Sequence, residues 1–189
     1  IVVGDVSDHG IASALLMTSA RAFLRQRASK TGYLNQILAD VNRELARDVE
    51  DSGRFMTLFI CEIDRPNIII RWVNAGHDPA FTFDPNAGNF EELAGHSLPL
   101  GVSEKAAYQE FQRKISPGQI LLIGTDGIWE THNKTGEMFG KEALMEIIRN
   151  NYTASARQIV DTVTEALGQF RGDEVPEDDI TLVVIKVDR

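Results

Sequence analysis

The stretch FMTLFICEI-DRPN-IIIRWV, residues 55–73, decides the fold class of this chain. Its two outer runs, 55–63 and 68–73, are rich in the apolar, β-branched and aromatic residues that are typical of buried strands. The four residues between them, Asp64 to Asn67, have the composition of a turn. A short turn joins two strands antiparallel, because a parallel pair needs a crossover of a dozen or more residues. Residues 55–73 therefore predict an antiparallel hairpin.

The pattern on both sides extends this hairpin into an α+β fold with antiparallel sheets. The expected strands are 1–3, 80–83, 89–93, 108–115, 119–124 and 180–187, and the expected helices are 11–27, 34–46, 139–150 and 155–170. Residues 4–10 are expected to form a loop. The first half of helix 11–27 is apolar almost all round, so we expect it to be buried. Stacked sheets with helices outside would bury the apolar faces.

Composition limits the classes of function. The chain has 189 residues, which suits one domain, and a formal net charge of −9, which argues against a nucleic-acid-binding protein. Its single cysteine, Cys61, has no partner for an internal disulfide and predicts a reducing, cytoplasmic location. No apolar stretch reaches the roughly 20 residues of a membrane span. Because a strand opens the chain without a leading segment, we expect a fragment of a longer protein.

Aspartates stand at the edges of three apolar runs. Asp5 follows the run at 1–3, Asp126 follows the run at 120–123, and Asp178 and Asp179 precede the run at 180–184. One such aspartate is usually only a turn or a helix cap, but three in strand contexts form a stronger signal. Carboxylates that converge repel one another, and a hard divalent cation relieves that repulsion. Gly127 beside Asp126 would let the backbone approach an ion or a phosphate closely.

Seven ordered blocks of sequence resemble the bacterial branch of the PP2C-like (PPM) serine/threonine phosphatases, the SpoIIE/RsbU-type phosphatase domain. The resemblance spans essentially the whole chain. The blocks are GDVSDHG at 4–10, FMTLF at 55–59, NAGHDP at 74–79, LPLG at 98–101, TDGIWE at 125–130, GEMFG at 136–140 and DDITL at 178–182.

This resemblance implies one PP2C-like domain over residues 1–189, an α-β-β-α sandwich of two stacked antiparallel sheets flanked by helix pairs. It implies Mn²⁺- or Mg²⁺-dependent hydrolysis of phosphoserine or phosphothreonine, with two ions that activate a water. By similarity, Asp5 bridges the ions, the backbone carbonyl of Val6 joins the coordination, and Asp126 and Asp178 bind them. Asp179 supports Asp178 or replaces it. Asp5, Asp126 and Asp178 are thus the expected catalytic residues.

Other residues near these blocks have smaller expected roles. His77 is a general acid or, as we favour, a hydrogen-bonded histidine that holds its loop; His9 is expected to anchor the metal loop. Gly127 belongs to the same surroundings, whereas Trp129 and Met138 are expected to pack. The family often has glycine where this chain has Asp8, so the loop is expected either to differ locally or to gain an extra carboxylate near the metals. The family also carries strands and an acidic segment upstream of the first aspartate block.

The implied substrate is a small phosphorylated regulator, an anti-sigma-factor antagonist of the STAS type. The implied setting is bacterial signalling, with a sensor or receiver domain in an upstream part of the protein. No nucleic acid is expected as a partner, and a homodimer is left open. Two alternatives stay open as well: a non-catalytic pseudophosphatase that binds a partner through the same fold, and a metal-dependent phosphoesterase with another specificity.

Overall fold

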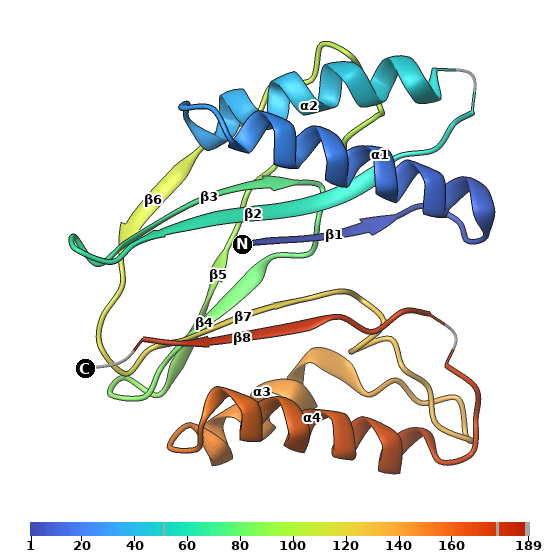
Figure 1. Ribbon diagram of the computed structural model, residues 1–189. Coiled ribbons are helices and arrows are strands. Elements are labelled where there is room, and N and C mark those ends of the chain that lie inside the picture. Colours follow the sequence, from blue (N-terminus) through green and yellow to red (C-terminus); the bar gives the residue numbers. More distant parts are fainter. Residues whose placement is uncertain (51, 177, 188–189) are drawn as a thin grey trace. The chain divides into compact units, whose positions relative to one another are not determined.

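The computed structural model describes residues 1–50, 52–176 and 178–187. Its contacts divide the chain into two compact units, each made of two pieces of sequence. Unit 1 comprises Ile1–Pro79 and Ala94–Lys114, and unit 2 comprises Ala80–Leu93 and Ile115–Arg189. Within the described residues, each unit has one four-stranded antiparallel sheet and two helices, so the expected α+β class with two antiparallel sheets is confirmed (Figure 1).

Unit 1 is built around the hairpin at 55–73. Its strands are β1 (Val2–Val6), β2 (Met56–Asp64), β3 (Ile69–Ala75) and β6 (Phe111–Lys114), in the sheet order β1-β2-β3-β6. The hairpin pairs Ile63 with Ile70 and Leu58 with Ala75. Its helices are α1 (Ile11–Ala28) and α2 (Leu34–Val49). Apolar residues of α2 repeat at helical spacing, and this stripe lies in the core against the sheet.

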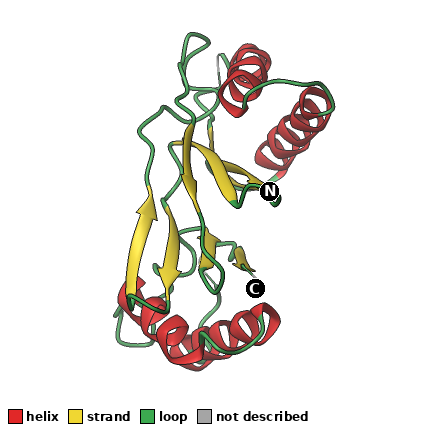
Figure 2. Cartoon of the chain, turned by 90° about the vertical axis from the view of Figure 1, so that its left-hand side faces the viewer, coloured by secondary structure: helices red, strands yellow, loops and turns green. Residues whose placement is uncertain are grey.

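Unit 2 repeats the same layering with different residues. Its strands are β4 (Ala80–Asp84), β5 (Asn89–Leu93), β7 (Ile120–Gly124) and β8 (Leu182–Lys186), in the order β5-β4-β7-β8. Its helices are α3 (Gly140–Asn151) and α4 (Ala156–Arg171), which lie side by side along the sheet (Figure 2). Ser155 caps α4 through a reciprocal capping box with Gln158. The core joins the two helices to β4 and β7.

Two expectations about the start of the chain are wrong. The strand does not end at Val3, because the ladder continues until Val6 pairs with Met56. Gly4 acts as a packed strand residue there and not as a breaker, since a Cβ on it would lie 2.4 Å from the Met56 side chain. The loop therefore begins after Val6, and Asp5 lies inside the strand.

The first half of α1 is also not buried as expected. Ile11 is 82% exposed and Leu15 is 64% exposed. The helix contributes Leu16, Ala20 and Leu24 to the core of unit 1, a single stripe with a spacing of four residues. A helix on a sheet buries one face only, so apolar residues on its other faces stay in contact with solvent. Among the described residues, no helix has the length and apolar character that a membrane span requires.

Candidate functional site

The aspartates of unit 2 that are expected to bind metal, Asp126 and Asp178, lie beside the paired ends of two neighbouring strands. β7 and β8 are antiparallel, and Gly124 at the end of β7 pairs with Leu182 at the start of β8. The segment that leaves β7 therefore meets the segment that enters β8. A carboxylate oxygen of Asp126 and one of Asp178 lie within 4.8 Å of each other. Residues 52 positions apart in the sequence thus come together through strand pairing.

Thr125 ties these two segments to each other. Its side chain is buried, and its hydroxyl Oγ1 donates to the carbonyl of Asp179 at 3.1 Å and accepts from the amide of Thr181 at 3.0 Å. The backbone amide of Thr125 donates to the carbonyl of Thr181 at 3.1 Å. Thr125 is not among the site residues expected from the sequence. A threonine directly before Asp126 and another two residues after Asp179 were the available signal for this contact.

Gly127 is required for the close approach of the same two segments. A Cβ built on Gly127 would lie 2.5 Å from the carbonyl oxygen of Asp179 and 3.6 Å from the Cβ of Asp178. The expected reason for this glycine was access for an ion or a phosphate. The structure gives another reason, namely that the chain entering β8 passes directly over Gly127. Any side chain here would push the Asp178–Asp179 segment away.

The backbone at both aspartates fixes their carboxylates. Oδ1 of Asp126 accepts from the amide of Gly127 at 3.0 Å, and Oδ1 of Asp178 accepts from the amide of Asp179 at 2.7 Å. Two carboxylates within 4.8 Å of each other repel, although the exposure of Asp178 lets solvent screen part of that repulsion. A divalent cation turns this repulsion into attraction, and oxygen donors are the ligands that Mg²⁺ and Mn²⁺ prefer. The residues present therefore fit such an ion.

In unit 1, Asp5 is held in β1 opposite Thr57. Oγ1 of Thr57 lies 2.8 Å from Nδ1 of His77 and 3.5 Å from the backbone carbonyl of Asp5. Val6 is the last residue of the strand. Strand pairing thus fixes the backbone of Asp5 and Val6, the two expected metal ligands of this unit.

His77 belongs to a tight turn that follows β3. Its backbone amide donates to Oδ1 of Asn74 at 2.8 Å, and Nδ2 of Asn74 donates to the carbonyl of His77 at 2.7 Å. Gly76 in this turn has a φ of +69° and lies against Pro99. The ring is thereby set against Thr57, which is the geometry that a loop-holding histidine requires. Its role as a general acid stays a hypothesis.

Ser7, and not His9, anchors the loop that follows Asp5. The amide of Ser7 donates to the carbonyl of Phe55, and its hydroxyl accepts from the amide of Phe55, both at 3.0 Å. His9 is exposed, and its ring has no hydrogen-bond partner within the described part of the chain. Asp8 has a φ of +63°, a left-handed conformation that glycine adopts freely, so the expected local difference from a glycine lies in a strained backbone position.

Of the two residues expected to pack, only Trp129 does so. Trp129 is buried in the core of unit 2, and Nζ of Lys141 lies 4.6 Å from the centre of its ring. Met138 is 58% exposed, because it sits in a bridge with His132 outside the core. Among the expected site residues, the structure brings together Asp126, Gly127, Asp178 and Asp179 in unit 2. Asp5, Val6, His9 and His77 belong to unit 1.

Comparison with known proteins gives three kinds of match. The family model described as Stage II sporulation protein E (SpoIIE) matches residues 1–188. Protein IcfG of Synechocystis sp. is 28% identical over 98% of this chain and 33% of its own length. Phosphoserine phosphatase RsbU of Bacillus subtilis is 26% identical over 98% of this chain and 55% of its own length. The chain thus spans between a third and about half of these curated relatives.

Among solved structures, the SiaA-PP2C domain of Pseudomonas aeruginosa matches with a TM-score of 0.86 and 20% identity. The match covers 99% of this chain and 75% of that chain. At this identity the likeness concerns the fold, and it confirms the PP2C-like fold expected from the sequence blocks.

Proposed function

Because this chain belongs to the SpoIIE family, whose model matches residues 1–188, we propose that it hydrolyses phosphoserine or phosphothreonine with the help of divalent cations. The resemblance to SpoIIE/RsbU-type PP2C phosphatase domains, drawn from seven sequence blocks, is confirmed by this match. The observation that carries the proposal is the pair Asp126 and Asp178, whose carboxylate oxygens lie within 4.8 Å of each other at paired strand ends.

In this proposal Asp126 and Asp178 bind the cations, and Asp5 and the carbonyl of Val6 complete the set of ligands. Two ions, Mn²⁺ or Mg²⁺, are expected. When bound, such cations acidify a coordinated water and offset the negative charge of the phosphoryl oxygens. The chain itself positions the ligand side chains. The Thr125 hydroxyl links the segments beside β7 and β8 through hydrogen bonds, Gly127 permits their close approach, and pairing of β1 with β2 fixes the backbone of Asp5.

The presence of all four expected acidic residues, one inside β1 and three beside the paired ends of β7 and β8, supports an enzyme and not a pseudophosphatase. These carboxylates do not stabilise the fold by themselves, since like charges that converge destabilise it without a cation. The residues are Asp5, Asp126, Asp178 and Asp179. Asp179 is expected to act mainly through its backbone, because its carbonyl accepts from Thr125 at 3.1 Å. We assign it a supporting role.

We further propose that the substrate is a small phosphorylated regulator of the STAS type, in a bacterial signalling system with a sensor or receiver domain upstream. RsbU, whose name describes a phosphoserine phosphatase, supports the monoester substrate. The cytoplasm is the proposed location, because the single cysteine, Cys61, has no partner for an internal disulfide, as is usual for proteins of a reducing compartment. Burial raises the pKa of this thiol to about 11, so it is unreactive.

Phosphate release from a phosphoserine peptide tests the proposal, with Mn²⁺, Mg²⁺ or a chelator. Asp126→Asn should lower the Mn²⁺-dependent rate by at least about 100-fold, since even outer partners of a metal site are worth about 10–100-fold. Asp48→Asn, at an exposed position on α2, makes the same chemical change outside the site and should keep the rate. Full activity in chelator would overturn the metal-dependent reaction. Faster cleavage of phosphodiesters would assign another specificity.

A further inference from the structure

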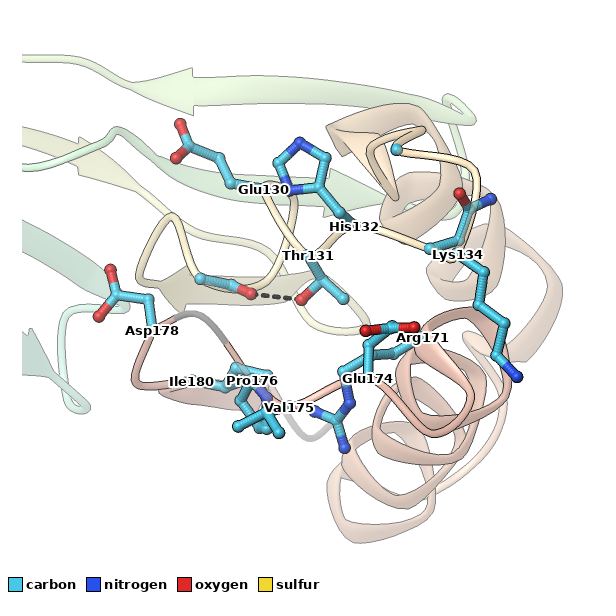
Figure 3. Close-up of a pocket in the computed structure, with 13 residues that line it drawn as sticks. Glu130, Thr131, His132, Lys134, Arg171, Glu174, Val175, Pro176, Asp178 and Ile180 are labelled. Carbon is cyan, nitrogen blue, oxygen red and sulfur yellow. Dashed lines mark hydrogen bonds between the residues drawn. The ribbon is translucent and has the colours of Figure 1, made fainter.

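A cavity of about 530 Å³ lies in unit 2 next to Asp178 (Figure 3). Three segments form it: the turn after β7, the C-terminal end of α4 and the loop that leads into β8. Its volume falls within the range of about 300–1,000 Å³ that is usual for ligand sites. Because Asp178 is one of the lining residues, a group that fills the cavity lies beside the proposed phosphoester site.

One wall of the cavity is apolar and exposed. Val175 is 80% exposed and Ile180 is 40% exposed, and Pro176 lies next to Val175. Exposed apolar surface gains roughly 25 cal/mol for each Å² that a ligand covers. The wall is short, so it suits an aliphatic chain better than a large ring system.

Two carboxylates belong to the lining of the same cavity and come from different segments. Glu130 comes from the turn after β7, and Glu174 comes from the loop that leads into β8 (Figure 3). Within the described residues, neither carboxylate has a hydrogen-bond or ion-pair partner. An aliphatic stem that ends in a cation complements both features, and lysine and arginine side chains have that structure.

The basic residues of the lining are less available to a ligand. Nζ of Lys134 lies 3.3 Å from Oδ2 of Asp173, and Figure 3 shows the Lys134 side chain extending away from Asp178. Arg171 also lines the cavity and is the exception, because its buried Nε has no hydrogen-bond partner among the described residues. An acidic segment that uses Arg171 is therefore the competing ligand, and an experiment has to separate the two.

The charge of the chain favours a basic ligand. Unit 2 holds 16 acidic against 7 basic residues, so 16 − 7 gives −9, whereas unit 1 holds 12 of each and is neutral. The whole net charge of the chain therefore resides in the unit that contains the cavity. Such a field attracts basic segments and repels acidic ones.

We propose that this cavity is a specificity pocket that receives a lysine or arginine side chain of the phosphorylated protein, close in sequence to its phosphoserine. The stem of that side chain packs on Val175 and Ile180, and its cationic head binds Glu174 or Glu130. This inference rests on the proposed phosphatase function, since the pocket selects substrates for the site at Asp178.

Peptide binding without turnover tests the pocket separately from catalysis. Fluorescent phosphoserine peptides carry Lys, Gln or Glu at successive positions on either side of the phosphoserine, and their anisotropy is measured with the chain in chelator. At one position the Lys peptide should bind about threefold to fivefold more tightly than the Gln peptide, as expected for an exposed ion pair. Glu130→Gln combined with Glu174→Gln should bring this ratio close to one.

Glu165→Gln, on an exposed position of α4 outside the cavity, is the matched control and should keep the ratio. Glu174→Lys should reverse it, so that the Glu peptide binds more tightly. Equal binding of Lys and Gln peptides, a preference of the unsubstituted chain for Glu, or an unchanged ratio in the double variant would overturn the pocket. Phosphate release from the Gln peptide with Mn²⁺ is measured in parallel. Its absence would overturn the proposed function and leave the binding ratio as evidence for or against the pocket.

Discussion

Replacing Gly127 with alanine should damage the proposed metal site through a single steric contact. The added Cβ would lie 2.5 Å from the carbonyl oxygen of Asp179, about 0.9 Å short of the 3.4 Å at which ordinary contact begins. The atom it meets belongs to the backbone, so no side-chain rotation relieves the overlap. Overpacking of this kind costs about 1–3 kcal/mol, which for a chain of this size lowers Tm by roughly 2–12 °C.

The same overlap should displace the Asp178 carboxylate, because Asp178 directly precedes the residue that is pushed. A misplacement of about 1 Å at a reacting centre can cost about 100-fold in rate. We expect Gly127→Ala to weaken Mn²⁺ binding by at least about tenfold, as measured by calorimetric titration, and to lower the unfolding temperature, as measured by circular dichroism.

Gly168→Ala is the matched control for this prediction. Gly168 lies within α4, and a Cβ on it would meet nothing within 4 Å. The same substitution should therefore stabilise the chain by up to about 1 kcal/mol and leave Mn²⁺ binding unchanged. The reasoning would be refuted if Gly127→Ala kept its Mn²⁺ affinity, whether or not stability fell, because the close approach would then not position Asp178.

Three further predictions concern stability. Thr125→Val should cost about 2 kcal/mol in urea unfolding, since it removes two partly buried hydrogen bonds worth about 1 kcal/mol each, whereas Thr125→Ser should recover most of the loss. Equal losses in the two variants would refute the role of the Thr125 hydroxyl. Leu16→Ala should cost about 2–5 kcal/mol and Leu15→Ala less than about 0.5, because Leu16 is 6% exposed and Leu15 is 64% exposed. The Arg27 guanidinium, 2.6 Å from Asp40, holds the pKa of that carboxyl below its usual value. This ion pair contributes at most about 1 kcal/mol to the free energy of unfolding, because the pair is partly exposed. The contribution is fully present above the unfolded pKa of about 3.9 and is lost as pH falls through the lower pKa of the folded state. Arg27→Gln should therefore flatten the acid limb of a stability-against-pH curve, and an unchanged limb would contradict this.

The elements of the fold were largely predictable because their signals are local. The hairpin at 55–73, the helices and the strand order in each hairpin follow from periodicity and turn composition, and most boundaries agree within a few residues. The errors have a common cause. β1 continues to Val6 because β2 provides partners, and the first half of α1 is exposed because the sheet covers only one helix face. Neither partner is visible in the local pattern.

For the candidate site, the sequence by itself determined which residues we propose as the ones that carry the chemistry. Two signals pointed to Asp5, Asp126 and Asp178 before any contact was known. These were the aspartates at the edges of three apolar runs and the seven ordered blocks that carry the family resemblance. Only the tertiary structure decided how Asp126 and Asp178 meet, through the Thr125 hydroxyl and the passage of Asp179 over Gly127. Residue types and spacing show which side chains are able to bind a cation. The contact between the two segments, in contrast, depends on the pairing of β7 with β8, which no local pattern encodes.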